Sequence, residues 1–487
     1  MDSDRTGSGL PETCRTEIGQ AGAGQAGASQ PGTGDDRAGI GPAAVFPRAM
    51  GGWVAVLGWA AYLACSWTWC IGMYMPALVM RDHGIAGFLV FAIPNVIGAA
   101  ALGFIAPGGR RLASWIDAHR PAIRWFSRIT IGFHLYFAGM LMGTLLPIWA
   151  PLAGAVVIAV VLAIGRLRPR RITLLASVIW GVSAAVAGGI WFTGPEPRHD
   201  VVMAAAEPAL ALGLLPVSAF GFLLCPYLDA TFLHARAGSG TGSRAAFGIG
   251  FGVLFFLMIL FTAMYAPLLP GLAGTGVVAG TGASLLALHL ILQAGFTVGV
   301  HADRGLTSAA MHGSSDSAGY SDTGGYSDTG GYSSTGEYGD GRRTGGTVRL
   351  SVIAGLLIGL GFLARALPGL GPYSAPEVGY RVFLSFYGLV FPAYVWLAVI
   401  PSGFSAVRPS RATLRVVGLA IAAAFPFYGL GFLWGSPWWT VPGVAIVILS
   451  RLLLPRTDHD TDVSAEAATG GDPGGDPGDR ARDALPS

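Results

Sequence analysis

The chain has 487 residues, of which 52% are hydrophobic and only 12% are charged. Because soluble domains carry about 25% charged residues, this composition excludes an ordinary soluble domain and indicates a chain that lies mostly in lipid. The net charge of +3 is spread over loops and indicates no nucleic-acid partner, and the four cysteines lack the spacing of a zinc site.

The chain begins with a polar segment, residues 1–50, whose composition lacks apolar periodicity and predicts a disordered cytoplasmic tail. Apolar runs of membrane-spanning length, or close to it, then follow one another, and we count twelve of them. The fourth run is short, and its separation from the third depends on Pro147 and Pro151. The runs, numbered as spans 1 to 12, are Trp53–Met80, Gly84–Ala106, Ile129–Trp149, Pro151–Gly165, Ile172–Thr193, Pro208–His234, Ala245–Leu269, Val277–Val300, Val348–Leu367, Gly379–Ile400, Leu414–Trp434 and Trp438–Leu454.

The distribution of arginine, the only basic residue type other than histidine, predicts the orientation of the spans. With the N-terminus in the cytoplasm, the inside segments near the membrane hold 21 arginines, and the outside loops hold Arg81, Arg198, Arg365 and Arg381. Positive residues concentrate on the cytoplasmic side of membrane proteins. We therefore expect a multi-pass protein of the cell (inner, cytoplasmic) membrane with both termini in the cytoplasm.

Three further segments are polar or amphipathic. Residues 301–347 repeat the motif Gly-Tyr-Ser-Asp-Thr-Gly without an apolar face, which predicts a disordered cytoplasmic loop. Residues 457–487 predict a disordered acidic tail. Residues 110–128 mix arginines with Trp115, Phe126 and other apolar residues, which predicts an amphipathic helix on the inner leaflet.

Spans 1 and 6 are unusually long, and both are interrupted. Span 1 has 28 residues and contains Gly72 and Pro76, and span 6 has 27 residues and contains Pro226. A helix needs about 20 residues to cross the hydrocarbon core. Because proline removes a helix hydrogen bond, we expect helix breaks at Pro76 and Pro226, the second opening near Phe222.

The two interrupted spans lie five apart and cross the membrane in opposite directions, which is the sequence sign of an inverted repeat. Chance is the alternative, because proline and glycine are frequent in membrane helices. We predict an all-α integral membrane protein with about 12 transmembrane helices, formed by a 5+5 inverted-repeat core and two C-terminal helices. The repeats are residues 51–193 and 194–401, and the two accessory helices lie in residues 402–456.

The breaks are the expected binding site, because free carbonyls and side-chain oxygens there can replace water around a cation. Asp229 is the sharpest candidate, since a charge at membrane depth costs about 2.5–3.5 kcal/mol and should face a partner, water or an ion. The alternative is a structural salt bridge or a place at the inner interface, seven residues before Arg236. The candidates for ion or substrate binding at the breaks are Ser66, Thr68, Trp69, Gly72, Tyr227, Asp229 and Thr231.

Span 8 adds His289, Gln293 and Thr297, which are spaced four residues apart and therefore share one helix face. A polar stripe on an apolar membrane helix must face protein or a water-filled path. We add the three residues to the candidate binding site. Hydrogen bonding inside the core is the alternative for His289 and Gln293.

A family resemblance appears in the segment Pro226-Tyr227-Leu228-Asp229-Ala230-Thr231-Phe232, which leads through His234-Ala235-Arg236 to Arg244-Ala245-Ala246-Phe247-Gly248-Ile249-Gly250. It resembles the sodium:solute symporters of the amino acid–polyamine–organocation (APC) superfamily, and Phe386–Tyr394 is also similar to the corresponding part of that family. The resemblance implies a five-plus-five inverted repeat (LeuT-like) and a sodium site formed by carbonyls of the first core helix and adjacent hydroxyls of the eighth. The family usually has a Ser-Thr pair at this place in the eighth helix, where this sequence has Phe296-Thr297. Thr297 is therefore the one hydroxyl of the pair that carries over.

These patterns predict a secondary active transporter, not an enzyme, that moves a small solute by alternating access. Na⁺ or H⁺ would be the coupling ion, no other cofactor is expected, and the lipid bilayer and the solute are the expected partners. The alternative is a transporter-like sensor or scaffold that binds solute without translocating it and signals to an unidentified protein through the loop and tails. An intramembrane enzyme would need Asp229, His134 and His289 to converge. No nucleotide-binding motif occurs that would indicate an ATP-driven pump.

Overall fold

The computed structural model describes residues 52–68, 70–164, 167, 169–193, 208–265, 281–306, 340–370 and 373–455, all within the larger of the chain's two units, Ala43–Ser487. Within these ranges the chain is helical and has no β-strand, so the predicted all-α class is confirmed. The predicted tails 1–50 and 457–487 lie outside the described residues, as does most of the predicted loop 301–347.

Long apolar helices dominate the part of the chain that the structure describes. Six are long and apolar enough to cross a membrane, and a seventh span results if the bent pair Leu215–Leu228 and Ala230–Gly238 counts as one. Shorter apolar helices accompany them at Gly52–Trp67, Ala150–Ile164, Ser351–Ala366 and Pro437–Leu453. The chain is therefore a multi-pass membrane protein, as its composition predicts.

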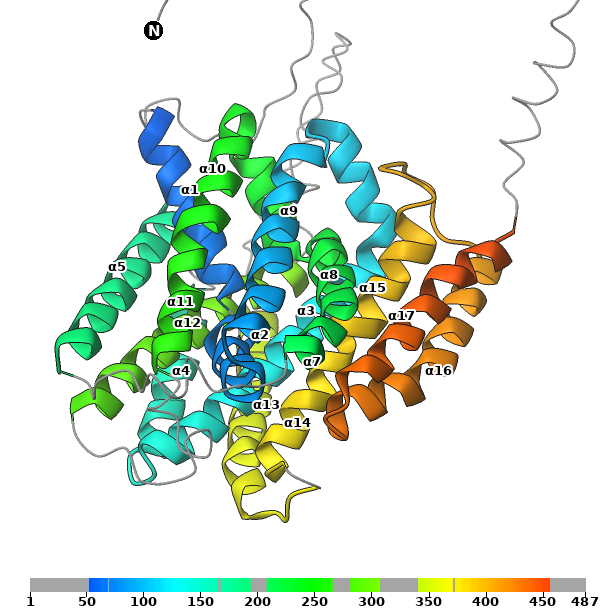
Figure 1. The fold of residues 1–487 in the computed structure, drawn as a ribbon. Helices are drawn as coiled ribbons and strands as arrows, with labels where there is room; N and C mark the ends of the chain where they lie inside the picture. Colours follow the sequence, from blue (N-terminus) through cyan, green and yellow to red (C-terminus); the bar gives the residue numbers. More distant parts are fainter. Residues whose placement is uncertain are drawn as a thin grey trace, which may run out of the picture. The chain divides into compact units, whose positions relative to one another are not determined.

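The helices before residue 194 follow one another with short connections (Figure 1). They are α1 (Gly52–Trp67), α2 (Cys70–Ile105), α3 (Gly109–Leu145), α4 (Ala150–Ile164) and α5 (Pro169–Thr193).

The middle of the chain is divided into shorter pieces. It contains α7 (Pro208–Gly213), α8 (Leu215–Leu224), the 3₁₀ turn η1 (Cys225–Leu228), α9 (Ala230–Gly238), α10 (Ser243–Ile249), the π-helical η3 (Gly250–Phe255), α11 (Phe256–Tyr265) and α12 (Thr281–Leu306). The last part contains α13 (Asp340–Leu363), α14 (Ala375–Ser385), the π-helical η7 (Phe386–Val390), α15 (Phe391–Tyr394), the π-helical η8 (Val395–Val399), α16 (Arg411–Leu433) and α17 (Thr440–Leu449). Both ends of the predicted loop 301–347 are helical, because α12 continues to Leu306 and α13 begins at Asp340.

Helix α12 lies at the centre of this arrangement and packs against α1, α3, α4, α5 and α9. Helices α16 and α17 pair at one flank, where they pack on α14 and α8 (Figure 1). Helices buried on several sides have apolar residues all around, and their polar residues must therefore meet partners inside the protein.

The boundary between spans 1 and 2 lies at Gly84, the residue at which span 2 was predicted to begin. Helix α2 runs from Cys70 to Ile105 but consists of two helices joined by a kink at Gly84, where φ is 57° and ψ is −153°. Glycine adopts this positive φ without the steric penalty that a Cβ would bring. The predicted break at Pro76 is wrong, because α2 continues through that proline.

The predicted amphipathic surface helix at residues 110–128 is also wrong. These residues are the first half of α3, which continues without interruption to Leu145. Trp115 and Phe126 are fully buried, and their rings contact those of Phe404 and Phe391. The apolar face is present as predicted, but protein covers it instead of lipid.

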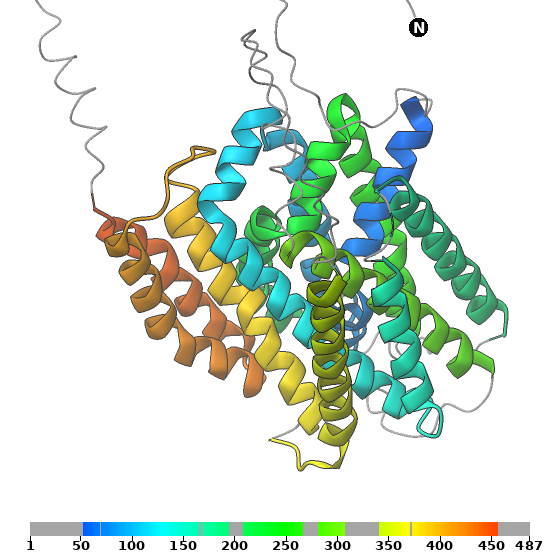
Figure 2. The same ribbon diagram turned by 180° about the vertical axis from the view of Figure 1, so that it is seen from behind.

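Helices α3 and α13 approach each other closely because both carry glycine at the crossing (Figure 2). A Cβ at Gly139 would lie 1.9 Å from the carbonyl oxygen of Ile358, and one at Gly361 would lie 1.9 Å from that of Tyr136. Small residues let membrane helices bring their backbones together.

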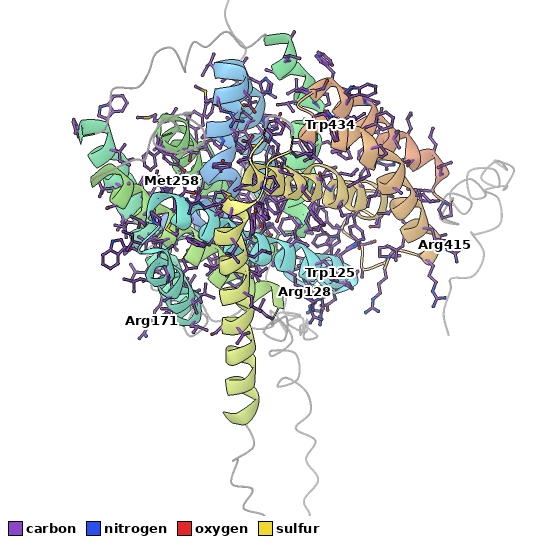
Figure 3. The ribbon with its side chains drawn as sticks, turned by 90° about the horizontal axis from the view of Figure 1, so that it is seen from below. Trp125, Arg128, Arg171, Met258, Arg415 and Trp434 are labelled. Carbon is purple, nitrogen blue, oxygen red and sulfur yellow. The ribbon has the colours of Figure 1, made fainter. Side chains whose placement is uncertain are left out.

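Three of the arginines at the surface can be located in the view from below. Figure 3 places Arg128, Arg171 and Arg415 toward the edge from which the start of α13 projects, and Trp434 toward the opposite edge. These arginines come from α3, α5 and α16, so three separate helices present a basic residue at the same edge.

Candidate functional site

The first helix break lies between α1 and α2, earlier than Gly72 and Pro76. Helix α1 ends at Trp67 and α2 begins at Cys70. The Thr68 hydroxyl donates to the Ala64 carbonyl at 2.7 Å, so it satisfies a carbonyl at the end of its own helix. Trp69, a predicted substrate contact, lies outside the described residues.

Side chains from three other helices supply hydrogen bonds at this break. The Thr297 hydroxyl of α12 donates to the Cys65 carbonyl at 3.3 Å. The Cys70 N–H donates to His134 Nε2 of α3 at 3.0 Å, and the Tyr380 hydroxyl of α14 donates to the Cys70 carbonyl at 3.1 Å. The break is therefore held by groups that belong to the surrounding helices.

The two contacts of His134 define its tautomer. Its Nδ1 lies 2.7 Å from the Thr130 carbonyl, which can only accept, so Nδ1 carries the hydrogen. Nε2 is then the acceptor that the Cys70 N–H needs. His134 is thus a neutral hydrogen-bonding bridge between α3 and α2.

Pro76 does not break α2, because another helix replaces the hydrogen bond that it removes. The missing N–H would have bonded the Gly72 carbonyl. The Thr262 hydroxyl of α11 donates to that carbonyl instead, at 2.7 Å. A Cβ at Gly72 would lie 3.2 Å from the Phe255 ring, so Gly72 serves the packing of α2 on η3 and α11 and does not line the site proposed from the sequence.

The second break lies at Asp229, three residues after Pro226. Helix α8 continues to Leu224, beyond the opening expected near Phe222, and the 3₁₀ turn η1 carries the chain to Leu228. Asp229 then adopts extended φ/ψ angles of −78° and 110°, and α9 leaves at 60° to the segment before it. Pro226 begins this change by removing a helical hydrogen bond, and the Asp229 side chain completes it.

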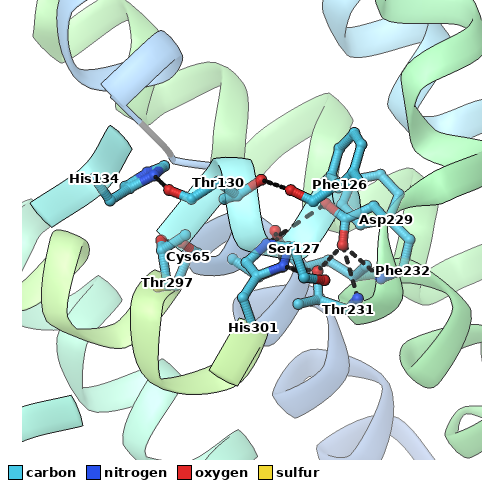
Figure 4. Close-up of polar contacts among 12 residues, drawn as sticks. Cys65, Phe126, Ser127, Thr130, His134, Asp229, Thr231, Phe232, Thr297 and His301 are labelled. Carbon is cyan, nitrogen blue, oxygen red and sulfur yellow. Dashed lines mark hydrogen bonds and ion pairs between the residues drawn. The ribbon is translucent and has the colours of Figure 1, made fainter. Parts of the chain in front are cut away.

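Asp229 caps α9 with one carboxylate oxygen. Its Oδ1 accepts from the Thr231 N–H at 2.7 Å, from the Thr231 hydroxyl at 2.6 Å and from the Phe232 N–H at 3.4 Å (Figure 4). An acidic N-cap satisfies free backbone donors and complements the positive end of the helix dipole. The side chain is fully buried in the protein, so the carboxylate is not exposed to solvent.

The two breaks meet through a pair of hydroxyls. The Oγ atoms of Thr231 and Ser66 lie 3.2 Å apart, and Ser66 belongs to the last turn of α1. Because Thr231 also donates to Asp229, the carboxylate is linked to the span 1 break through these hydroxyls. Thr297 reaches the same break from α12.

The second carboxylate oxygen of Asp229 has a different environment. Oδ2 is buried and has no hydrogen-bond partner among the described residues. His301 Nε2 of α12 lies 3.9 Å from it, and His301 Nδ1 lies 3.4 Å from the Ser127 hydroxyl of α3 (Figure 4). At 3.9 Å the two atoms are too far apart for a hydrogen bond, and they form an ion pair only when the imidazole is protonated.

His289 and Gln293 form a separate polar group farther along α12. His289 Nδ1 lies 2.9 Å from the Ser183 hydroxyl of α5, and Gln293 Nε2 donates to the same hydroxyl at 3.0 Å. Gln293 also contacts the Cys65 sulfur at 3.8 Å. These two residues therefore join α12 to α5 and α1 by core hydrogen bonds, which was the alternative for them, and they do not contact Asp229.

Tyr227, the remaining predicted site residue, does not join the group around Asp229. Its half-buried ring stacks on Phe404 at a centroid distance of 5.9 Å. In contrast, the sequence patterns did not indicate His301 and Ser127. His301 follows Thr297 by four residues, so the polar stripe of α12 continues into the segment that the repeat motif assigns to a loop.

No protein-family model matches the chain, and no curated protein is similar to it in sequence. The site must therefore be understood from its own geometry. Among the described residues, no three or more His, Cys, Asp and Glu side chains form a group that could hold a metal ion.

A compact ionic cluster joins α2 to α14 away from Asp229. Arg81 donates to both carboxylate oxygens of Glu377 at 2.7 and 3.0 Å, and Arg381 donates to Glu377 Oε1 at 2.8 Å and to Asp82 at 2.7 Å. Glu377 is buried, and buried charges are stable only when they are paired and hydrogen-bonded. The cluster connects the turn of α2 next to Gly84 with the start of α14.

Proposed function

We propose that the protein is a secondary active transporter that moves a small solute across the cell membrane by alternating access, coupled to sodium ions or protons. The observation that carries this proposal is the meeting of two helix breaks at a fully buried carboxylate, Asp229. Interrupted helices that meet inside the membrane provide free polar groups for solutes and ions, and each half-helix can move as a unit.

The packing of the helices supports an inverted repeat of five spans. Span 1 packs on span 7 (α1 with α10 and η3), and span 6 packs on span 2 (α8 with the part of α2 after Gly84, where Phe91 contacts Phe222). Span 3 packs on span 9 (α3 with α13), and span 8 packs on span 4 (α12 with α4). When every span is replaced by the span five places away, the contact of spans 1 and 7 becomes that of spans 6 and 2, and the contact of spans 3 and 9 becomes that of spans 8 and 4. A two-fold repeat requires such matching contacts.

Three further contacts follow the same exchange. Span 1 packs on span 5 (α1 with α5), and span 6 packs on span 10 (α8 with η7). Spans 3 and 8, which exchange with each other, pack together as α3 and α12. We therefore propose a core of ten spans with two accessory spans, α16 and α17, and twelve spans in all.

The proposed orientation places both termini in the cytoplasm. The supporting observations are the excess of arginine in the segments assigned to that side and the common edge of Arg128, Arg171 and Arg415 in Figure 3. Asp229 then lies where span 6 bends, with α9 continuing toward the cytoplasm.

Uptake by proteoliposomes tests the proposal. Radiolabelled amino acids, sugars, nucleobases and carboxylic acids are tested one class at a time, with an inward sodium gradient, an inward proton gradient or no gradient. We expect one class to accumulate under a gradient. Asp229→Asn should reduce that accumulation by about tenfold or more, because a hydrogen bond to a charged group contributes about 1.5–3 kcal/mol.

Asp117→Asn is the matched control, because the Asp117 carboxylate is partly exposed and pairs with Arg120 on the same helix. It should transport like the unaltered protein. A solute that raises the unfolding temperature but never accumulates under either gradient would contradict transport and favour a sensor that binds without translocating.

A further inference from the structure

Asp229 and His301 form a pair between two different helices of the proposed transporter. Asp229 begins α9, the half-helix that follows the break, whereas His301 belongs to the long helix α12. Both side chains are fully buried, and the carboxylate Oδ2 faces the imidazole Nε2 across 3.9 Å.

We propose that Asp229 and His301 together bind one proton and that this proton is the coupling ion, an inference that rests on the proposed transport function. With the carboxylate ionised and the imidazole neutral, the pair carries one buried negative charge, which low-dielectric surroundings disfavour strongly. One proton, bound to Asp229 Oδ2 or to His301 Nε2, makes the pair neutral as a whole.

Within the part of the chain that the structure describes, His301 is the one candidate that could compensate the negative charge of Asp229. Among the described residues, no arginine forms an ion pair with Asp229, and His301 is its one ion-pair partner. The titratable groups that act electrostatically on Asp229 or His301 from neighbouring elements are His134 on α3, Cys225 on η1 and Tyr387 on η7.

These neighbouring groups already use their hydrogens in other bonds. The Cys225 thiol donates to the Tyr387 carbonyl at 3.2 Å, and the Tyr387 hydroxyl lies 2.5 Å from that of Thr130. His134 donates to the Thr130 carbonyl and accepts from a backbone N–H. These three groups therefore do not supply a hydrogen to Asp229 Oδ2, and the neutralising proton is assigned to Asp229 and His301.

The ligand atoms favour a proton over sodium. Oδ1 already accepts three hydrogen bonds, which leaves Oδ2 as the free acceptor of the carboxylate. The atom facing Oδ2 is a nitrogen, whereas hard cations prefer several oxygen ligands. An imidazole and a carboxylate can instead share a proton in a short charge-assisted hydrogen bond.

Proton binding also couples chemistry to movement. A hydrogen bond between Oδ2 and Nε2 requires a distance below about 3.2 Å, so the pair must approach by about 0.7 Å when the proton binds. Release breaks this bond and returns the charge to the carboxylate. Because the two groups begin α9 and end the buried stripe of α12, proton binding would draw these helices together.

Infrared difference spectroscopy of the full chain in lipid nanodiscs, recorded during a pH titration with protons as the only added ligand, tests the site. We expect a protonated-carboxyl band that titrates in the unaltered protein, is lost in Asp229→Asn, and shifts in both frequency and titration midpoint in His301→Gln. Asp117→Asn should leave that band unchanged. His119→Gln is a matched control for the histidine change, because His119 is also buried but contacts Tyr394 instead.

The proton site is overturned if no titrating band is lost in Asp229→Asn, or if His301→Gln leaves the band and its midpoint unchanged. Each variant is first checked for a monodisperse, folded state, and His301→Gln keeps the test valid should Asp229→Asn misfold. Uptake driven by sodium with no titrating Asp229 band would remove the proton site alone. A titrating band without accumulation of any solute would remove the transport function and leave the site.

Discussion

The hydrogen bond from Thr262 to the Gly72 carbonyl should be important for stability because Pro76 leaves that carbonyl without its helical donor. Replacing Thr262 with valine keeps the side-chain shape and removes the hydroxyl. The Gly72 carbonyl is then a buried acceptor that water does not reach. Thr262 also bonds the Met258 carbonyl in its own helix at 3.0 Å, but that carbonyl lies within regular helix.

An unsatisfied buried polar group costs about 1–3 kcal/mol, and side-chain hydrogen bonds in membrane proteins contribute about 0.6 kcal/mol on average and at most about 1.7. We therefore expect Thr262→Val to lower the free energy of unfolding by about 1–2 kcal/mol. In the Pro76→Ala background, the new N–H can bond Gly72, so Thr262→Val should cost about 1 kcal/mol less there.

A double-mutant cycle measured by reversible SDS unfolding in mixed micelles, with tryptophan fluorescence as the signal, checks this prediction. Thr144→Val is the control, because the Thr144 hydroxyl bonds the Met140 carbonyl of its own helix, and it should change the unfolding free energy by less than about 0.5 kcal/mol. Additive effects of Thr262→Val and Pro76→Ala, within about 0.3–0.5 kcal/mol, would refute the reasoning.

Two further predictions concern packing and charge. Gly139→Ala should lower the unfolding free energy by about 1–3 kcal/mol, because the added Cβ would lie 1.9 Å from the Ile358 carbonyl oxygen. In the same unfolding assay, Gly181→Ala should be neutral or slightly stabilising, because its added Cβ would have nothing within 4 Å. Glu377→Gln should lower the free energy of unfolding by about 3–5 kcal/mol, because it removes a buried carboxylate that pairs with two arginines. The control Asp117→Asn, at a partly exposed carboxylate, should lower it by less than about 1 kcal/mol. Equal shifts in unfolding temperature for these two variants would contradict a structural role for the ionic cluster.

The importance of Asp229 could be inferred from the sequence because the cost of a charge in an apolar span is a local property. Its role as the cap of α9 could not, since the position of the break depends on which groups satisfy the freed backbone. Pro76 and Pro226 have the same local effect, yet α2 continues through the first and the chain bends three residues after the second. Thr262, 186 positions along the chain from Pro76, accounts for the continuity of α2.

Composition and apolar run length by themselves determined that this is a helical membrane protein, because burial in lipid imposes both on every span. The four-residue spacing on span 8 was likewise sufficient to place His289, Gln293 and Thr297 on one helix face. Only the tertiary structure decided that Thr297 reaches the break between α1 and α2. It also placed His301 next to Asp229 and buried the apolar face of α3 against protein. These outcomes depend on partners supplied by distant helices, and local periodicity carries no information about which helix supplies them.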